Sequence, residues 1–248
     1  GTMQQDSLRR QKYKKLTDCI VLSCENRAAR HILVLLLLLH FSLVGVEHRP
    51  LGPLISKKYT TFAHIAIPIP FAMSVIAQSS VVSRLRQMWS SGQLPHALLL
   101  AGPSGAGQMA VALDFARLLL CEKPEGSGEA AHPCGTCPSC RMVERYAHPD
   151  LHFSFPVIRP KNASSTSQVV SDLWITEWRA MLTDGAYFDL DEWGQRMGIE
   201  KQQPCIYADE SDELLRKVSI VSARGGYKVV IVWLPELMNV TCANKILK

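Results

Sequence analysis

Residues 102–109, Gly-Pro-Ser-Gly-Ala-Gly-Gln-Met, have the spacing of a phosphate-binding loop. They lie between an apolar run and an alanine-rich segment, and the N–H groups that open a helix at such a loop attract phosphate. A working loop continues with Lys for the outer phosphates and Ser or Thr for magnesium. This chain has Gln108 and Met109 there, so ATP binding is left open. The loop frame itself is kept by Gly102, Gly105 and Gly107.

A second motif of nucleotide hydrolysis is also altered. Residues 228–233, Lys-Val-Val-Ile-Val-Trp, read as a strand buried on both faces. In an ATPase of this type the strand ends in Asp-Glu, which serve magnesium and the attacking water. Here Trp233 and Leu234 occupy the place of those acids. We therefore assign no catalytic residue.

Four cysteines form a candidate metal site between the two motifs. Cys134, Cys137 and Cys140 follow at two-residue gaps, and Cys121 lies upstream. Four thiolates saturate a tetrahedral zinc ion, and a closed site of this kind is structural. We expect a structural zinc module over about residues 121–148. Two alternatives stay open, namely completion of the site by His132 or His148 in place of Cys121, and an iron–sulfur cluster.

The spacing of apolar residues predicts the elements that hold these motifs. An amphipathic helix is expected over 74–89, a buried strand over 97–101 and a sheet-packed helix over 109–120. Strand, glycine loop and helix in this order indicate an α/β domain with a parallel sheet and crossover connections. Further strands are expected over 151–158 and 228–233, and further helices over 172–182, 189–197, 209–223 and 238–248.

Residues 1–70 differ in composition from the rest of the chain. They carry ten Lys or Arg against four Asp or Glu, whereas residues 71–248 carry 17 against 18, which together give the net charge of +5. The apolar run 32–46 is shorter than a membrane span of roughly 20 residues and resembles a signal-peptide core. We treat residues 1–70 as an extension that is either signal-like or translated from a misplaced start, and residues 71–248 as the domain.

Residues 71–248 resemble the delta-prime family of bacterial DNA polymerase III clamp-loader subunits. The resemblance rests on the altered loop, the cysteine cluster and the segment around 228–248. The chain looks most like the Bacteroidetes form, through segments such as His-Pro-Asp-Leu-His-Phe-Ser-Phe at 148–155. The resemblance implies an AAA+ P-loop domain followed by a lid and a collar. These parts, and the family's arginine finger, would lie beyond Lys248, so we expect a chain truncated at its C-terminus.

The same resemblance implies a role and a set of partners. Subunits of this family are stators, which do not hydrolyse ATP but support gamma/tau and delta subunits in a hetero-pentameric ring. The ring places the sliding clamp on primed DNA. The resemblance further implies Cys121, Cys134, Cys137 and Cys140 as zinc ligands, a cytoplasmic location and no membrane contact.

Two other functions are weighed against the stator. An active gamma/tau-type ATPase would share the fold, but Gln108 and Trp233 count against it. A zinc-containing DNA-binding module is disfavoured because residues 71–248 are close to neutral, and DNA binding relies on clustered positive charge.

Overall fold

The computed structural model describes residues 75–76, 78–160, 168–199, 202–224 and 226–246, and the backbone of 18–25. Its strands are β1 (Asp18–Glu25), β2 (Ala97–Gly102), β3 (Leu151–Ser154) and β4 (Lys228–Trp233). The helices are α2 (Ser79–Ser90), α3 (Gln108–Leu120), α4 (Pro138–Glu144), α5 (Ile175–Asp184), α6 (Leu190–Arg196), α7 (Asp209–Ser219) and α8 (Val240–Ile246). Short 3-10 helices are η2 (Gly128–Ala130), η3 (Ser171–Trp174) and η4 (Pro235–Leu237).

The four strands form one sheet in the order β2-β1-β4-β3. β3 and β4 are parallel, whereas β1 pairs antiparallel with both β2 and β4. β2, β4 and β3 therefore run in one direction. The α/β class is confirmed, and the expected parallel pairing holds for β3 and β4, whereas β1, which lies between β2 and β4 in the opposite direction, makes the whole sheet mixed.

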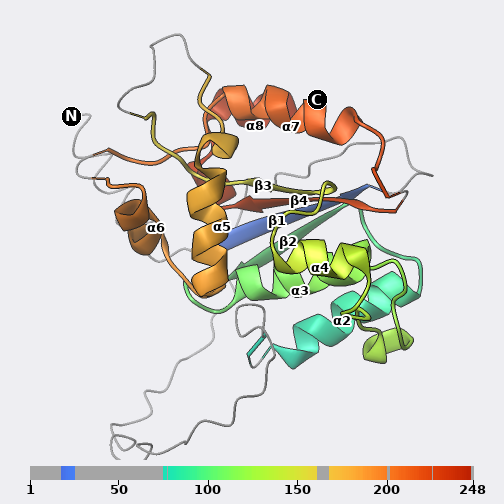
Figure 1. Ribbon diagram of the computed structural model, residues 1–248. Coiled ribbons are helices and arrows are strands. Elements are labelled where there is room, and N and C mark those ends of the chain that lie inside the picture. The colour runs from blue at the N-terminus through green and yellow to red at the C-terminus, as the bar shows by residue number, and fades with distance from the viewer. Residues whose placement is uncertain are drawn as a thin grey trace, which may run out of the picture.

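Helices cover both faces of this sheet (Figure 1). Val229, Ile231 and Trp233 of β4 pack into the main core with α3, whereas Val230 and Val232 pack against α7 and α8. The alternation follows from the two-residue period of a strand, and burial of both faces explains why β4 is apolar throughout. β2 is one of the two edge strands and is less buried than expected, with Leu99 49% exposed.

Aromatic side chains fill the space between the end of β4 and helices α5 and α6. The Trp178 ring stacks on Phe155 with centroids 4.1 Å apart and contacts Trp193 at 5.2 Å and Trp233 at 5.3 Å. Trp178 and Trp193 are fully buried. Such contacts add to the area that each ring buries. The structure thus places Trp178 in the core.

The predicted helices and strands are confirmed with shifted ends. β3 ends at Ser154 rather than at residue 158, and the helix expected over 172–182 is η3 followed by α5. The division of the chain at residue 70 stays a prediction, but the sheet includes β1 from before it. The apolar run 32–46 lies outside the described residues. Within the described part, no helix combines the length and the apolar character needed to cross a membrane.

Glu210 in α7 makes stability depend on pH in a defined direction. Its carboxyl is 1% exposed and accepts a hydrogen bond from the Ser171 N–H at 2.7 Å. Burial raises the pKa of Glu210, although the Ser171 bond opposes this. At pH values between the unfolded and the folded pKa of Glu210, the native state binds more protons than the unfolded state. The free energy of unfolding therefore falls as pH rises through this range. We expect Glu210→Gln to stabilise the protein by on the order of 1 kcal/mol at neutral pH.

Urea unfolding at several pH values between about 4 and 8 checks this expectation. Glu213, on the same helix, is the matched control, because its hydrogen bond from Arg216 lowers its pKa. Its contribution is present above the unfolded pKa and is lost as pH falls through the folded pKa. The advantage of Glu210→Gln over wild type should therefore grow with pH, and Glu213→Gln should show no such gain. An advantage that is constant or shrinks with rising pH contradicts the assignment.

Candidate functional site

The glycine loop joins β2 to α3 and keeps the backbone shape that its sequence predicted. Gly105 and Gly107 have φ values of +76° and +89°, in the left-handed region that favours glycine. Gly107 is the N-cap of α3, and the Val111 N–H donates to its carbonyl at 3.0 Å. The loop therefore presents the start of a helix, the position at which related folds bind phosphate.

The two positions that should carry chemistry are engaged in structural contacts. The Gln108 Nε2 donates to the Pro103 carbonyl at 3.0 Å, which braces the loop internally, and Gln108 is only 9% exposed. Met109 is 4% exposed and belongs to the main core. A neutral amide in this position supplies no positive charge to a phosphate.

The end of β4 is apolar as well as lacking acids. Trp233 and Leu234 are 2% and 3% exposed, and both belong to the main core. The Trp233 ring lies 5.1 Å from the ring of Phe188. A magnesium ion would find no carboxylate at the place where hydrolysing relatives of this fold type supply one.

Between the loop and the end of β4 lies a cavity of about 10 Å³. One water molecule needs about that much room, whereas sites for small molecules measure roughly 300–1,000 Å³. The cavity has no space for a nucleotide. Its lining residues are Gly105, Gly107, Gln108, Met109, Ala186, Tyr187, Phe188 and Trp233.

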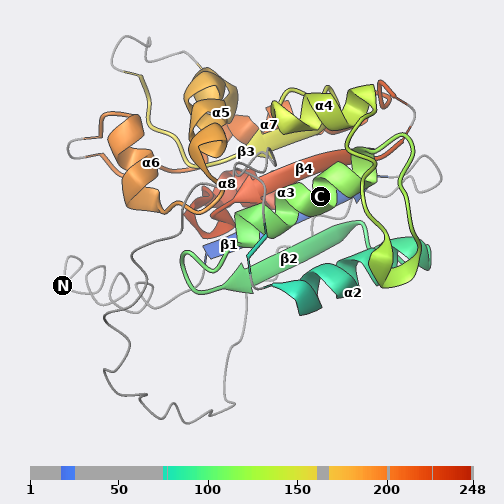
Figure 2. The same ribbon diagram turned by 60° about the horizontal axis from the view of Figure 1, so that its bottom comes forward.

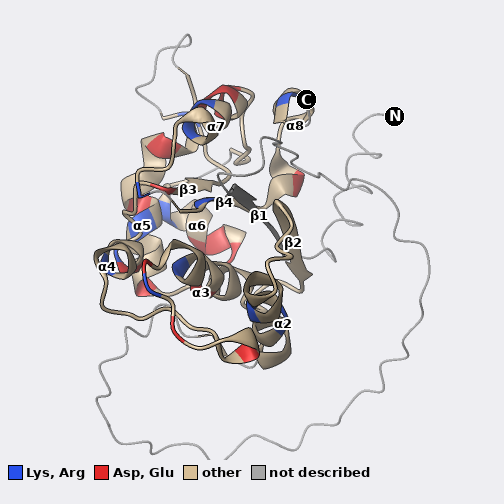
Figure 3. Ribbon diagram, turned by 90° about the vertical axis from the view of Figure 1, so that its right-hand side faces the viewer, with Lys and Arg blue, Asp and Glu red and all other residues tan. Residues whose placement is uncertain are grey.

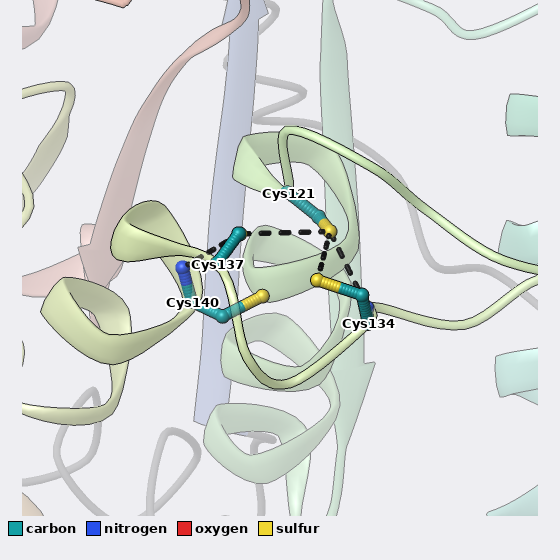
Figure 4. Close-up of side chains that lie close together, drawn as sticks. All are labelled: Cys121, Cys134, Cys137 and Cys140. Carbon is teal, nitrogen blue, oxygen red and sulfur yellow. Dashed lines mark hydrogen bonds between the residues drawn. The ribbon is translucent and has the colours of Figure 1, made fainter.

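The four cysteines come together as the sequence predicted (Figure 4). Cys121 caps the C-terminus of α3, Cys134 lies in the following loop, and Cys137 and Cys140 lie at the start of α4. Their Sγ atoms all lie within 4.8 Å of one another. Gly135, with φ +72°, turns the chain between Cys134 and Cys137. All four are free thiols, and none forms a disulfide.

The spacing of the sulfur atoms fits one tetrahedral metal ion. The Cys121 Sγ lies 3.5 Å from that of Cys134 and 4.0 Å from that of Cys137. Four thiolates at about 2.3 Å from a central ion would lie roughly 3.8 Å apart. A disulfide requires about 2.05 Å. An iron–sulfur cluster would hold the thiolates farther apart, because several atoms lie between them.

Backbone hydrogen bonds prepare these thiols for metal binding. The Cys134 N–H donates to the Cys121 Sγ at 3.3 Å, and the Cys140 N–H donates to the Cys137 Sγ at 3.4 Å. The N–H groups of Thr136 and Cys137 lower the pKa of Cys134 to about 6. Burial raises the pKa values of Cys121 and Cys140. A metal cation would favour the thiolate form at all of these cysteines, because the thiolate is the metal-binding form.

Neither candidate histidine joins the cysteine cluster. His132 lies beside Glu125, with Nε2 3.5 Å from the carboxylate, and its ring is half exposed. His148 is buried, and its Nδ1 accepts a hydrogen bond from the Asp150 N–H at 3.0 Å. Within the part of the chain that the structure describes, only the four cysteines gather around one point.

His148 also approaches Ser139, but the pair is not a nucleophile and base. Because the His148 Nδ1 accepts from a backbone N–H, its Nε2 carries the proton and donates to the Ser139 Oγ at 3.2 Å. Ser139 in turn donates to Glu122 Oε1 at 2.8 Å. The direction of the protons is opposite to that of an activated serine. The chain of bonds instead fixes α4 to the segment that follows Cys121.

Asp150, just before β3, is a buried carboxylate with several partners. Its buried carboxylate accepts hydrogen bonds from the Ala223 and Arg224 N–H groups and from the Ser222 hydroxyl, and the Lys228 Nζ lies 3.5 Å away. Burial would raise the pKa of Asp150, but these donors hold it below its usual value. Asp150 therefore anchors the loop before β4 to the start of β3.

Comparison with known proteins identifies the family to which the chain is similar. The family model described as "DNA polymerase III, delta subunit" matches residues 77–248. The delta' subunit of DNA polymerase III from Pseudomonas aeruginosa is 28% identical over 162 residues, which cover 65% of this chain and 35% of the relative. The delta' subunit from Bacillus subtilis is 35% identical over 79 residues, which cover 32% of this chain and 22% of the relative.

A second kind of relative is found alongside these. The tau subunit of DNA polymerase III from Escherichia coli is 36% identical over 93 residues, which cover 38% of this chain and 14% of the relative. The chain thus spans about a third or less of the length of these relatives. No solved structure matches the chain at a significant level. Because the family model covers more than half of its residues, the chain belongs to the DNA polymerase III delta subunit family, with delta'-like sequence.

Proposed function

We propose that this chain is a delta-prime-type subunit of a DNA polymerase III clamp loader that does not hydrolyse ATP. The proposal rests on the contacts of two residues, Gln108 in the glycine loop and Trp233 at the end of β4. The Gln108 amide is bonded to its own loop, and the Trp233 ring is packed in the core. Hydrolysis needs a cation at the first position and acids at the second.

The two losses are independent of each other, which strengthens the proposal. Gln108 lacks the charge that neutralises the outer phosphates, and the end of β4 lacks both the magnesium ligand and the base. One loss alone could leave weak activity. Both together leave the glycine loop the role of shaping an interface at which neighbouring subunits bind and hydrolyse ATP.

The partners follow from the names of the relatives. We propose that the chain assembles with gamma/tau and delta subunits in a hetero-pentameric AAA+ ring, and through it acts on the sliding clamp and primed DNA. The relatives named delta' and tau support this assignment. The location that such a role requires is the cytoplasm.

We further propose that the four cysteines hold zinc in a structural role. Residues Cys121, Cys134, Cys137 and Cys140 fit a closed tetrahedral site with no open position for a substrate. The ion would fasten the end of α3 to the start of α4. Its contribution is therefore to folding and not to chemistry.

One observation favours the alternative of a tau-type ATPase. The tau relative is 36% identical over its matched segment, whereas the two delta' relatives are 28% and 35% identical over theirs. Gln108 and Trp233 weigh against it. The charge distribution on the described helices weighs against the DNA-binding alternative. In Figure 3, Lys and Arg are interspersed with Asp and Glu over α3, α4, α5 and α7, whereas DNA binding relies on clustered positive charge.

Reconstitution tests the proposed function. The chain is mixed with tau and delta subunits of the same organism, and the assembly is followed by size-exclusion chromatography and by loading of labelled clamp onto primed DNA. We expect a ring that contains this chain and loads the clamp with ATP. A ring that assembles and loads equally well without the chain would contradict the proposal.

A further inference from the structure

The carboxyl ends of the parallel strands are occupied by a segment of the chain itself. Open α/β sheets bind ligands just beyond these ends. In this protein α5 and α6 lie at that end of the sheet (Figure 2). The connection between them includes residues 185–188, of which Ala186, Tyr187 and Phe188 line the cavity beside the glycine loop.

Tyr187 covers the start of α3 at close range. A Cβ atom added to Gly107 would lie 2.7 Å from Cε1 of the Tyr187 ring and 3.2 Å from its hydroxyl oxygen. The hydroxyl accepts a hydrogen bond from the Ile76 N–H at 2.8 Å. The hydroxyl is thus held by Ile76, and the ring edge lies over Gly107, while the side chain stays 38% exposed on its outer side.

Phe188 closes the other side of the same space. Its ring lies 5.1 Å from Trp233 and 5.4 Å from Trp178, both in edge-on contact. Phe188 therefore joins the segment to the aromatic cluster behind it. Between these rings and the loop only about 10 Å³ is left, far less than a phosphate group with its hydrogen-bond partners requires.

We propose that residues 185–188 are an internal plug, which occupies the nucleotide cradle and excludes nucleotide through the rings of Tyr187 and Phe188. The inference deepens the proposed non-hydrolysing function and rests on it for its biological meaning. The plug is a second reason for the lack of nucleotide binding, in addition to the missing lysine of the loop. Restoring the lysine of the loop is then insufficient for nucleotide binding while the plug is in place.

Nucleotide binding by variants of the full chain tests the plug. The probe is a fluorescent ATP analogue titrated into Gln108→Lys, Gln108→Lys/Tyr187→Ala and Gln108→Lys/Tyr187→Phe. The Tyr187→Phe variant is the matched control, since it keeps the ring and loses only the hydroxyl. An apparent Kd rises in inverse proportion to the fraction of molecules with an open site, so we expect the Ala double variant to bind at least about tenfold more tightly than the other two.

Equal binding by all three variants overturns the plug, and so does the absence of binding by a folded Ala double variant. Hydrogen exchange of the loop amides at 105–109 gives a second measurement without the added lysine. Tyr187→Ala should exchange faster there than wild type and Tyr187→Phe, and unchanged exchange contradicts the plug. These outcomes concern the isolated chain, so they are distinguishable from a failure of the chain to assemble in a loader.

Discussion

Cys137→Ser is expected to remove the bound metal and to lower the stability of the protein by about 3–5 kcal/mol, or roughly 10 °C in Tm. Cys137 is 8% exposed, and its Sγ lies 4.0 Å from that of Cys121 and caps α4 by accepting a hydrogen bond from the Cys140 N–H. Its loss leaves three thiolates at a site built for four. The proposed metal between α3 and α4 would then be held weakly, and the loop between the helices would lose its fixed ends.

Elemental analysis of the purified protein and thermal unfolding measure both effects. We expect one zinc ion per chain in wild type and almost none in the variant. Cys205→Ser is the matched control, because Cys205 is a partly buried free thiol outside the cluster. It should keep its metal and most of its stability. A metal-free wild-type protein that folds normally would falsify the structural metal site.

Trp233→Asp is expected to destabilise the protein by more than about 4 kcal/mol and not to restore hydrolysis. The substitution returns an acid to the end of β4, where hydrolysing proteins of this fold have one. Here the side chain is 2% exposed and packs against Trp178 and Phe188. The change leaves a cavity among the rings and places a carboxylate in it without a partner.

Urea unfolding and a basal ATPase assay check this prediction together. Trp233→Phe is the matched control, since it keeps an aromatic ring and should cost only about 1–2 kcal/mol. A Trp233→Asp protein that is as stable as wild type and gains magnesium-dependent ATP turnover would show that the site is a damaged ATPase site. The expected loss of stability would instead show that the strand end is part of the core.

Much of the site could be predicted because its signals are local in sequence. The cysteine spacing, the positive φ positions of Gly105 and Gly107 and the apolar run of β4 are all consequences of neighbouring residues. A strand buried on both faces has few alternatives to a continuous apolar run. The grouping of the four cysteines is therefore confirmed, whereas the metal and the reading of the two altered motifs stay predictions.

The cover of the glycine loop could not be predicted in the same way. Tyr187 and Phe188 meet Gly107 and Trp233 only through the packing of α5 and α6, and no spacing rule connects such distant positions. The sequence offers one signal for this cover, namely two adjacent aromatic residues shortly after Gly185. Such pairs are common in turns that lead into a core, so the signal is not specific. The hydrogen bonds of the buried Asp150 could not be predicted either, because a single carboxylate forms no recognisable sequence pattern.

The sheet order shows a second limit of sequence patterns. Charge and composition set residues 1–70 apart as an extension, yet β1 from this segment pairs with β2 and β4 in the middle of the sheet. Pairing depends on which strand edges are free, and the sequence of one strand does not state its neighbours. For the same reason the edge position and exposure of β2 were not foreseen.

The most direct test of the non-hydrolysing role is the rate of ATP hydrolysis by the reconstituted loader. Gln108→Ala in this chain is compared with replacement of the loop lysine in the tau partner. We expect the isolated chain to show no turnover above about 0.01 per second, far below typical enzymes. We also expect the loader to keep its rate with Gln108→Ala and to lose it with the tau substitution. Robust turnover by the isolated chain that Gln108→Ala abolishes would contradict the role.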